Sequence, residues 1–280
     1  MVRENVCVFS EPVMHDLDYA SCFMKQLAEE ARRAGVVTVV ETDGTASAND
    51  AALETYDPAV FYSVGHGQCC IHTVECMEPY IEAAGYHCEI EWQGEKYTYD
   101  CVTDRRLDFW VGRHVHLLSC VTGLNLGPEL IRHGARSFIG YDHFFLIGWY
   151  FTDEEIKPPA PCEPPDEYGD MYTAIDSDVE GERAIVLRGA SVGEAVAAMK
   201  AKFQEYIQKY TEGEWKDRLI AYWARTCLEH DLEHLVAYGD MDWRPCSAAA
   251  APPPSPIPLF LLFVPFGFLV LSLTKPPAKI

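Results

Sequence analysis

Five short runs rich in β-branched and aromatic residues recur along the first two thirds of the chain, separated by longer segments. The runs are 6–9, 36–40, 59–64, 114–118 and 137–140. Between the first two, segment 19–34 has apolar and small residues at helical spacing and ends before Gly35. Such alternation is typical of a parallel sheet with helices on both faces. We therefore predict an α/β fold, a three-layer sandwich with a mostly parallel central sheet.

Residues 68–106 interrupt this alternation after the third predicted strand. A hairpin pattern within them turns at Gly94 and Glu95. In that register Cys88 faces Cys101 at a non-hydrogen-bonded position, where the two Cα atoms lie about 4.5 Å apart, within reach of a disulfide. The redox compartment then decides whether they bond. An insertion at this place usually forms the rim of a site.

The chain has eleven cysteines, but no apolar signal segment follows Met1. A disulfide framework belongs to secreted proteins, so we expect most of these cysteines to be thiols. The formal charge is -21, from 22 basic and 43 acidic residues. This charge repels nucleic acid backbones, which makes nucleic acid an unexpected partner, and it favours cationic peptides. Acidity is also a common means of staying in solution.

Residues 152–183 contain eleven acidic residues, two basic residues and five prolines, with no sustained apolar period. This composition predicts an acidic loop or flap. After it, Ser191 and Glu194 have the spacing of a capping box, and an apolar stripe at helical spacing runs through 192–210. We expect a long docked helix there, within one domain that spans residues 1–246.

The C-terminal part changes character twice. Residues 247–256 are a linker of Ala, Pro and Ser, and residues 257–273 are an uncharged apolar run. Seventeen residues is the lower limit for a helix that spans a bilayer, and lipid tolerates Pro and Gly in such helices. We predict a single C-terminal transmembrane helix. Lys275 and Lys279 favour a cytoplasmic C-terminus, which would place the domain on the opposite side of the membrane. The absence of an apolar signal segment after Met1 instead favours the cytoplasmic face for the domain, so the sidedness stays open.

Two of the predicted strands end in residues that can react together. Run 59–64 leads into His66 and Gly67, and run 114–118 leads to Cys120. The carboxyl ends of parallel strands meet at one edge of a sheet, so we expect the imidazole and the thiol to meet there. Cys120 would attack an acyl carbon, His66 would transfer the proton, and the amides of Gly67 and Cys120 would bind the oxyanion. The alternative is a loop histidine and a buried small apolar cysteine.

Three segments around these residues resemble the caspase and gingipain clan of cysteine peptidases: Tyr62-Ser-Val-Gly-His-Gly67, Leu117-Leu-Ser-Cys-Val-Thr-Gly123 and residues 126–141. In that clan one apolar strand precedes His-Gly and another precedes Ala/Ser-Cys. Segments 191–202 and 238–240 are similar to the end of gingipain-type catalytic domains, so the likeness spans roughly residues 6–240. It implies a caspase-like fold and a cysteine endopeptidase that acts on peptide or protein substrates with a Cys-His dyad and no cofactor.

The resemblance also implies that a residue in the loop after the first strand reads the P1 side chain. This chain offers Glu11, Asp16 and Asp18 there. Carboxylates would match Lys or Arg at P1, which predicts cleavage after a basic residue. An ordinary helix-capping Asp is the alternative interpretation.

Two other functions stay open. One is a catalytically silent domain that binds peptides or partner proteins. The other is a zinc peptidase, because His230, Glu233 and His234 match the inverted zinc-peptidase pattern of two histidines one helical turn apart with a Glu as base. Such a site needs a third ligand, and beyond residue 234 only Asp240 and Asp242 are acidic.

Two further metal sites are weaker candidates. A soft metal could bind the group Cys69, Cys70, His72 and Cys76, although this group lacks paired Cys-x-x-Cys knuckles. Segment 176–181 begins like a calcium loop, but its twelfth position is Leu187 rather than Glu.

Overall fold

The computed structural model describes residues 2–12, 18–75, 78–92, 94–147, 171–218 and 220–246. The predicted linker 247–256 and apolar run 257–273 lie outside these residues. Among the described residues, the helices are all too short or too polar to cross a bilayer.

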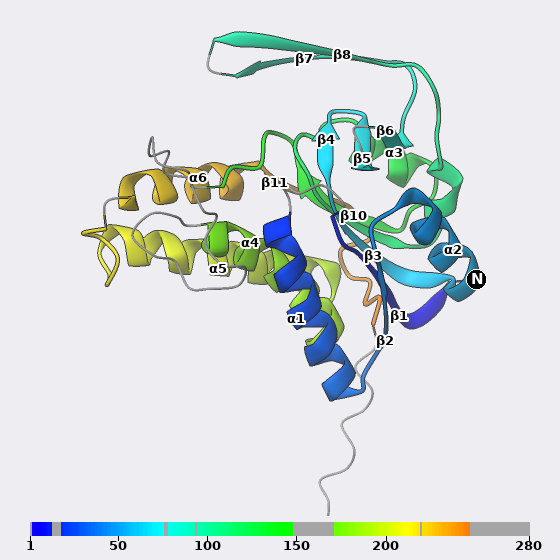
Figure 1. Cartoon of the computed structure of the whole chain (residues 1–280), viewed down its shortest axis with the longest axis horizontal. Helices are drawn as coiled ribbons and strands as arrows, with labels where there is room; N and C mark the ends of the chain where they lie inside the picture. The colour runs from blue at the N-terminus through cyan, green and yellow to red at the C-terminus, as the bar shows by residue number, and fades with distance from the viewer. Residues whose placement is uncertain are drawn as a thin grey trace, which may run out of the picture. The chain divides into compact units, whose positions relative to one another are not determined.

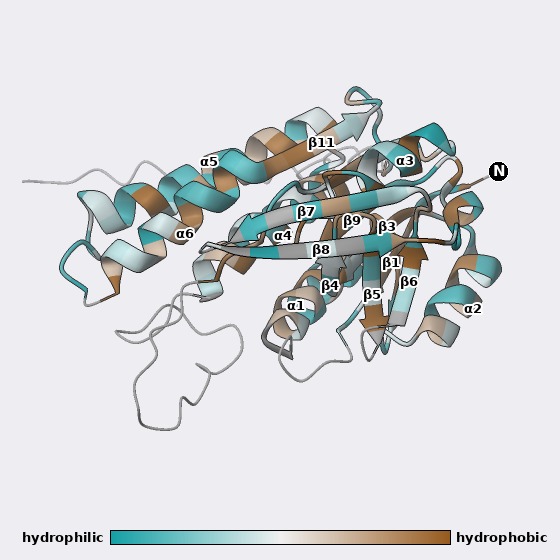
Figure 2. Ribbon diagram, turned by 90° about the horizontal axis from the view of Figure 1, so that it is seen from above, coloured by the Kyte–Doolittle hydropathy of each residue, from teal (hydrophilic) through white to brown (hydrophobic). Residues whose placement is uncertain are grey.

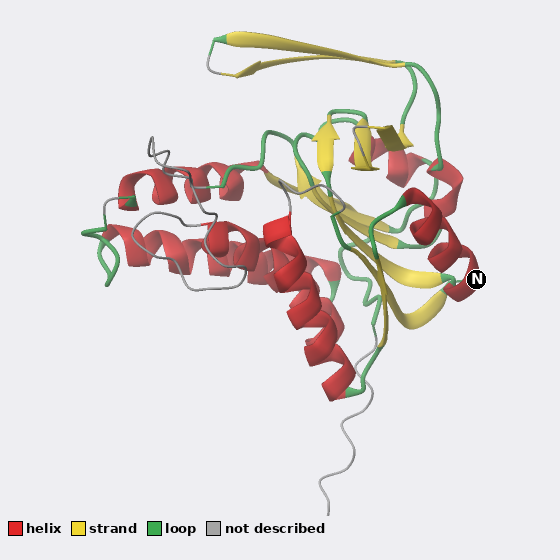
Figure 3. Cartoon of the chain, viewed as in Figure 1, coloured by secondary structure: helices red, strands yellow, loops and turns green. Residues whose placement is uncertain are grey.

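Six strands form the central sheet, in the order β11-β10-β9-β3-β1-β2 (Figures 1 and 3). They are β1 (Arg3–Ser10), β2 (Thr38–Thr42), β3 (Pro58–Val64), β9 (His114–Leu118), β10 (Ser137–Tyr141) and β11 (Leu235–Gly239). All neighbours are parallel except β11, which runs antiparallel to β10. The predicted α/β fold with a mostly parallel sheet is thus confirmed.

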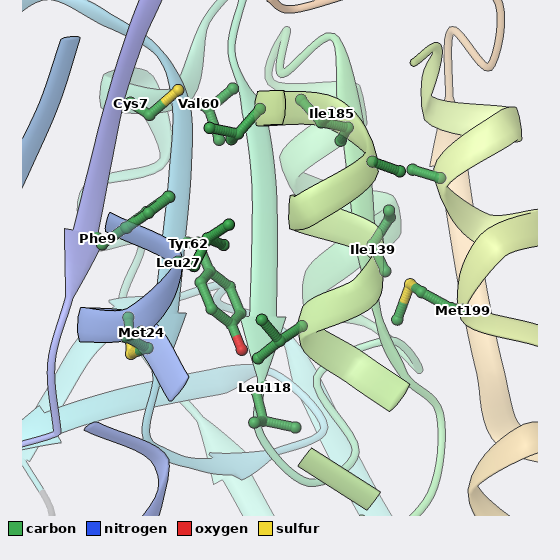
Figure 4. Packing of buried hydrophobic residues seen from close by; sticks show 14 of the residues in the cluster. Cys7, Phe9, Met24, Leu27, Val60, Tyr62, Leu118, Ile139, Ile185 and Met199 are labelled. Carbon is green, nitrogen blue, oxygen red and sulfur yellow. The ribbon is translucent and has the colours of Figure 1, made fainter. Parts of the chain in front are cut away.

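Helices cover both faces of this sheet, as in a three-layer sandwich. One face packs against α1 (Asp18–Ala34), α4 (Met171–Arg188) and α5 (Val192–Thr211), and α6 (Ala221–His234) packs against α5. The other face packs against α2 (Ala46–Tyr56), a 3-10 helix (Leu107–Trp110) and α3 (Leu126–Arg132). Strand β3 is buried along its whole length because it has a core on each side. Figure 4 shows Tyr62 of β3 and Leu118 of β9 within the first of these cores.

The predicted helix after residue 190 begins with the expected capping box. The Ser191 hydroxyl accepts a hydrogen bond from the Glu194 amide at 3.3 Å, and the Glu194 carboxylate accepts one from the Ser191 amide at 2.8 Å. Capping of this kind stabilises a helix by about 1 kcal/mol. The apolar stripe of α5 faces the sheet and its neighbouring helices, so this prediction is confirmed.

The prediction of a loop over residues 152–183 is wrong for its second part, since α4 begins at Met171. The acidic residues Asp176, Asp178 and Glu182 are buried on the inner side of this helix. Carboxylates therefore occupy core positions, which hides the apolar period. The calcium-loop hypothesis for 176–181 is also wrong because this segment is helical and the Asp178 carboxylate accepts hydrogen bonds from core side chains.

The insertion 68–106 forms two small sheets with residues on its border. One contains β4 (His66–Gln68), β5 (Ile71–Glu75) and β6 (Glu78–Glu82), and the other is the hairpin of β7 (Tyr86–Trp92) and β8 (Glu95–Cys101). The hairpin projects beyond the sheet edge on the side of β4 (Figure 1), and it crosses in front of the sheet when seen from that side (Figure 2).

The predicted register of this hairpin is wrong. Trp92 pairs with Glu95, so Cys101 faces Tyr86 and not Cys88. The turn lies one residue earlier than expected, and Gly94 adopts a φ of 82° that favours glycine.

The expectation of thiols is wrong for Cys69 and Cys70, which form the disulfides Cys69–Cys88 and Cys70–Cys101, so Cys88 and Cys101 are disulfide-bonded but not to each other. The hypothesis of a soft-metal site is also wrong, because the sulfur atoms of Cys69 and Cys70 are disulfide-bonded and do not serve as thiolate ligands. Within the described residues, four cysteines are not disulfide-bonded: Cys7, Cys120, Cys227 and Cys246.

Candidate functional site

His66 and Cys120 follow neighbouring parallel strands, β3 and β9. Val64 pairs with Leu118 at the ends of these strands, and the Gly65 amide donates a hydrogen bond to the Leu118 carbonyl at 3.2 Å. The two segments therefore leave the same edge of the sheet side by side. This is the backbone arrangement that the sequence predicts for the imidazole and the thiol.

The contact between these segments is closest at Gly67. A Cβ atom on Gly67 would lie 2.1 Å from the Cys120 carbonyl oxygen and 2.8 Å from the Thr122 methyl group. A Cβ on Gly65 would lie 2.0 Å from the Thr73 carbonyl oxygen. Real Cβ atoms do not approach backbone this closely, so a glycine is required on each side of His66.

The turn that carries Cys120 has an unusual backbone. Val121 has a φ of 61°, a region that a β-branched residue rarely adopts. Hydrogen bonds from the Val121 amide to the His143 carbonyl, at 2.8 Å, and from the Gly123 amide to the Tyr141 carbonyl, at 2.7 Å, hold the turn. Strained residues of this kind cluster at functional sites.

Cys120 is half-buried and packs beside Phe144 and the cysteines of the insertion. Burial raises the pKa of its thiol to about 11, and Asp231 adds to this, whereas a hydrogen bond from the Phe145 backbone opposes it. At neutral pH Cys120 is therefore a thiol. A base must remove its proton before or during any attack on an acyl carbon.

His72 holds the two strand ends together, a role that the sequence did not reveal. One ring nitrogen contacts the Ser63 hydroxyl at 2.9 Å and the other contacts the Ser119 hydroxyl at 3.1 Å. Burial, with a smaller effect of His66, lowers the pKa of His72 to about 3, so this buried ring is neutral. The His72 ring lies against the Gly65 backbone and contacts Ser119, the residue that precedes Cys120.

A buried charged network ties β9, the strand that leads to Cys120, to helix α4. His116 contacts Asp178 at 3.0 Å and Glu182 at 3.0 Å, and His114 contacts Glu182 at 3.2 Å. Burial alone would lower the pKa of His116, but the carboxylates of Asp178 and Glu182 raise it to about 10. Burial would raise the pKa of Glu182, but the two histidines lower it to about 2. The network therefore contains a buried ion pair.

The predicted specificity residues are only partly described. Glu11 forms an ion pair with Lys25 at 3.0 Å and lines a surface pocket beside α1. Asp18 is the first residue of α1, and its side chain, like the whole of Asp16, lies outside the described part of the chain. Of these three carboxylates, the structure therefore describes only that of Glu11.

His230 and His234, the histidines of the zinc-peptidase hypothesis, lie close to a third histidine that precedes them in the sequence. His143, in the segment after β10, joins His230 and His234 of α6, and the three potential ligand nitrogens lie within 4.8 Å of one another. Asp240, which the sequence offers downstream, is instead paired with Arg136 at 3.0 Å. Glu233 is exposed.

Comparison with known proteins adds no family. None of the protein-family models matches this chain, and the search of curated proteins found no significant match.

Proposed function

We propose that this chain is a cysteine endopeptidase with Cys120 as the nucleophile and His66 as the acid/base. The observation that supports this most is the contact of the Gly67 backbone with the Cys120 peptide, at the ends of two neighbouring parallel strands. The segments that carry His66 and Cys120 therefore lie side by side at one sheet edge. The resemblance to the caspase and gingipain clan supports the same assignment, because it implies a sheet of this kind.

The raised pKa of the Cys120 thiol determines the order of proton transfer. His66 removes the thiol proton as the sulfur attacks the carbonyl carbon of the scissile bond, and it then gives that proton to the leaving amine. The resulting thioester is hydrolysed by a water molecule that His66 deprotonates, which returns the proton to Cys120. The amides of Gly67 and Cys120 are the donors that stabilise the oxyanion in both steps.

The proposed substrate has Lys or Arg at P1. The net charge of -21 favours cationic peptides, and Asp16 and Asp18 provide carboxylates in the sequence between the end of β1 and the first turn of α1. Glu11 is the weaker candidate because Lys25 already neutralises it. A charge-assisted hydrogen bond contributes about 1.5 to 3 kcal/mol, or roughly ten- to a hundredfold in selectivity.

A peptide-library digest tests this function. Wild type, Cys120→Ala and Cys227→Ala are compared. Cys227 serves as a matched control because, in the described part of the chain, it is the other half-buried cysteine that is not disulfide-bonded. Cleavage by wild type and Cys227→Ala, but not by a folded Cys120→Ala, is expected. Equal cleavage by all three would refute the role of Cys120. No cleavage by any, with cationic peptides still bound, would favour the catalytically silent binding domain.

Matched substrates test the preference for a basic residue. Peptides with Arg, Lys, Asn, Asp or Leu at P1 are compared at low and high salt, since salt screens the long-range field more than a pocket contact. We expect Arg and Lys to be preferred at both salt concentrations and Asp16→Asn/Asp18→Asn to reduce the preference at least tenfold. A preference for Asp or Leu would refute it.

A further inference from the structure

Three imidazoles from distant parts of the chain meet beside the Cys120 turn. His143 follows β10, and His230 and His234 lie one turn apart on α6. Their ring centroids are 4.9 Å apart for His143 and His230, 4.7 Å for His143 and His234, and 4.4 Å for His230 and His234. We propose that these three histidines bind one divalent transition-metal ion, with zinc as the first candidate.

The potential ligand nitrogens lie close enough together that metal binding requires only a small movement of the three rings. One nitrogen from each ring lies within 4.8 Å of the other two. Tetrahedral zinc holds imidazole nitrogens at 2.0–2.1 Å, which sets them about 3.3 Å apart. The rings therefore have to approach one another by about 1.5 Å at most, which side-chain rotation can supply. Three partly buried imidazoles without a carboxylate ligand suit zinc, copper or nickel rather than calcium or magnesium.

The surroundings orient the two helix histidines as metal ligands usually are. His234 donates from Nδ1 to the Asp142 carboxylate at 2.8 Å, which directs Nε2 to the metal. His230 donates from Nε2 to the Phe144 carbonyl at 3.0 Å, which directs Nδ1 to the metal. A carboxylate or carbonyl behind a metal-binding imidazole fixes its tautomer and ring orientation.

The site would fasten the segment 142–146 between α6 and the Cys120 turn. This segment accepts a hydrogen bond from Val121 through His143, and its Leu146 amide donates to the Asp231 carboxylate of α6 at 2.7 Å. An ion that joins His143 to α6 adds a further connection here. The proposed role is therefore to hold the Cys120 turn in place, and Cys120 is not a ligand. This inference stands independently of the peptidase function.

Zinc content of the full-length chain tests the site. The protein is purified under non-reducing conditions, dialysed against zinc, then against metal-free buffer, and measured by elemental analysis. We expect one zinc per chain in wild type, Cys120→Ala and His87→Ala, and at least tenfold less zinc retained by His143→Ala, His230→Ala and His234→Ala. His87 is the control because it is an exposed histidine paired with Asp100. Zinc retained by all three variants, or lost equally from His87→Ala, would overturn the proposal.

Cobalt binding to the wild-type chain gives a readout that does not depend on variants folding. A site of three imidazoles gives visible bands without the near-ultraviolet thiolate-to-cobalt band. A thiolate band would place the ion on cysteine and refute the three-histidine site. Hydrogen exchange of wild type provides a second readout, with at least tenfold slower exchange expected in segment 142–146 when zinc is added. Unchanged exchange would refute the proposed role of the ion.

Discussion

The buried ion pair between β9 and α4 makes a quantitative prediction for the variant His116→Gln. A pKa that rises from the ordinary 6.5 to about 10 corresponds to about 5 kcal/mol of stabilisation by the charged histidine. The pKa of Glu182, lowered from 4.5 to about 2, reports the same contact and is not a second contribution. We expect His116→Gln to lower the free energy of unfolding by about 3 to 5 kcal/mol at pH 6, as breaking a buried pair does.

The sign of each pKa change determines how this stabilisation depends on pH. Because the folded state raises the pKa of His116, its contribution is complete below pH 6.5 and disappears as the pH rises to about 10. Because the folded state lowers the pKa of Glu182, its contribution is complete above pH 4.5 and disappears as the pH falls to about 2. The ion pair therefore stabilises the fold most between pH 4.5 and 6.5.

Urea unfolding at several pH values measures this dependence. The difference in unfolding free energy between wild type and His116→Gln should shrink by up to about 1.4 kcal/mol per pH unit between pH 6.5 and 10. Leu130→Ala, which removes a buried apolar side chain and no titratable group, serves as the control and should show a difference that does not change with pH. A constant difference for His116→Gln across this range would refute the assignment of a charged His116.

Three further predictions concern the site, its rim and the C-terminal run. Gly67→Ala should abolish peptidase activity while circular dichroism stays native, since its Cβ would meet the Cys120 carbonyl; full activity would contradict the contact. Reducing the two disulfides of the insertion should expose the hairpin to limited proteolysis, because each contributes about 3 kcal/mol; protease resistance in reductant would contradict this. The full-length chain should partition into membranes through the apolar run 257–273, whereas a chain ending at Cys246 should not. Recovery of the full-length chain in the soluble fraction without detergent would contradict the predicted transmembrane helix.

The central sheet could be predicted because its strands are continuous apolar runs. Strand β9 was predicted at its observed bounds, His114–Leu118, and β1, β2, β3 and β10 differ from their predictions only at their ends, whereas β11 was not predicted. The sequence pattern does not reveal α2, which buries only Asn49, Ala52 and Leu53. Its signal was instead the cap, since the Thr45 hydroxyl accepts a hydrogen bond from the Ala48 amide.

The features that escaped prediction depend on contacts between distant segments. The carboxylates on the inner side of α4 are explained only by their contacts with His114 and His116 of β9. The pairing of four cysteines depends on a hairpin register and on a loop that precedes it by about twenty residues. His143 lies 87 residues before His230, and only the packing of α6 on the segment after β10 brings the two together.

Labelling with a cysteine-directed peptidyl electrophile tests the central claim most directly. Wild type and the folded variant His66→Ala are incubated with a Lys- or Arg-containing peptidyl probe. The modified residue is then located by peptide mass spectrometry. The account predicts a single adduct on Cys120 in wild type, formed at least a hundredfold more slowly in His66→Ala, as expected from the loss of a general base. Labelling of Cys227 instead, or labelling of Cys120 at the same rate without His66, would contradict it.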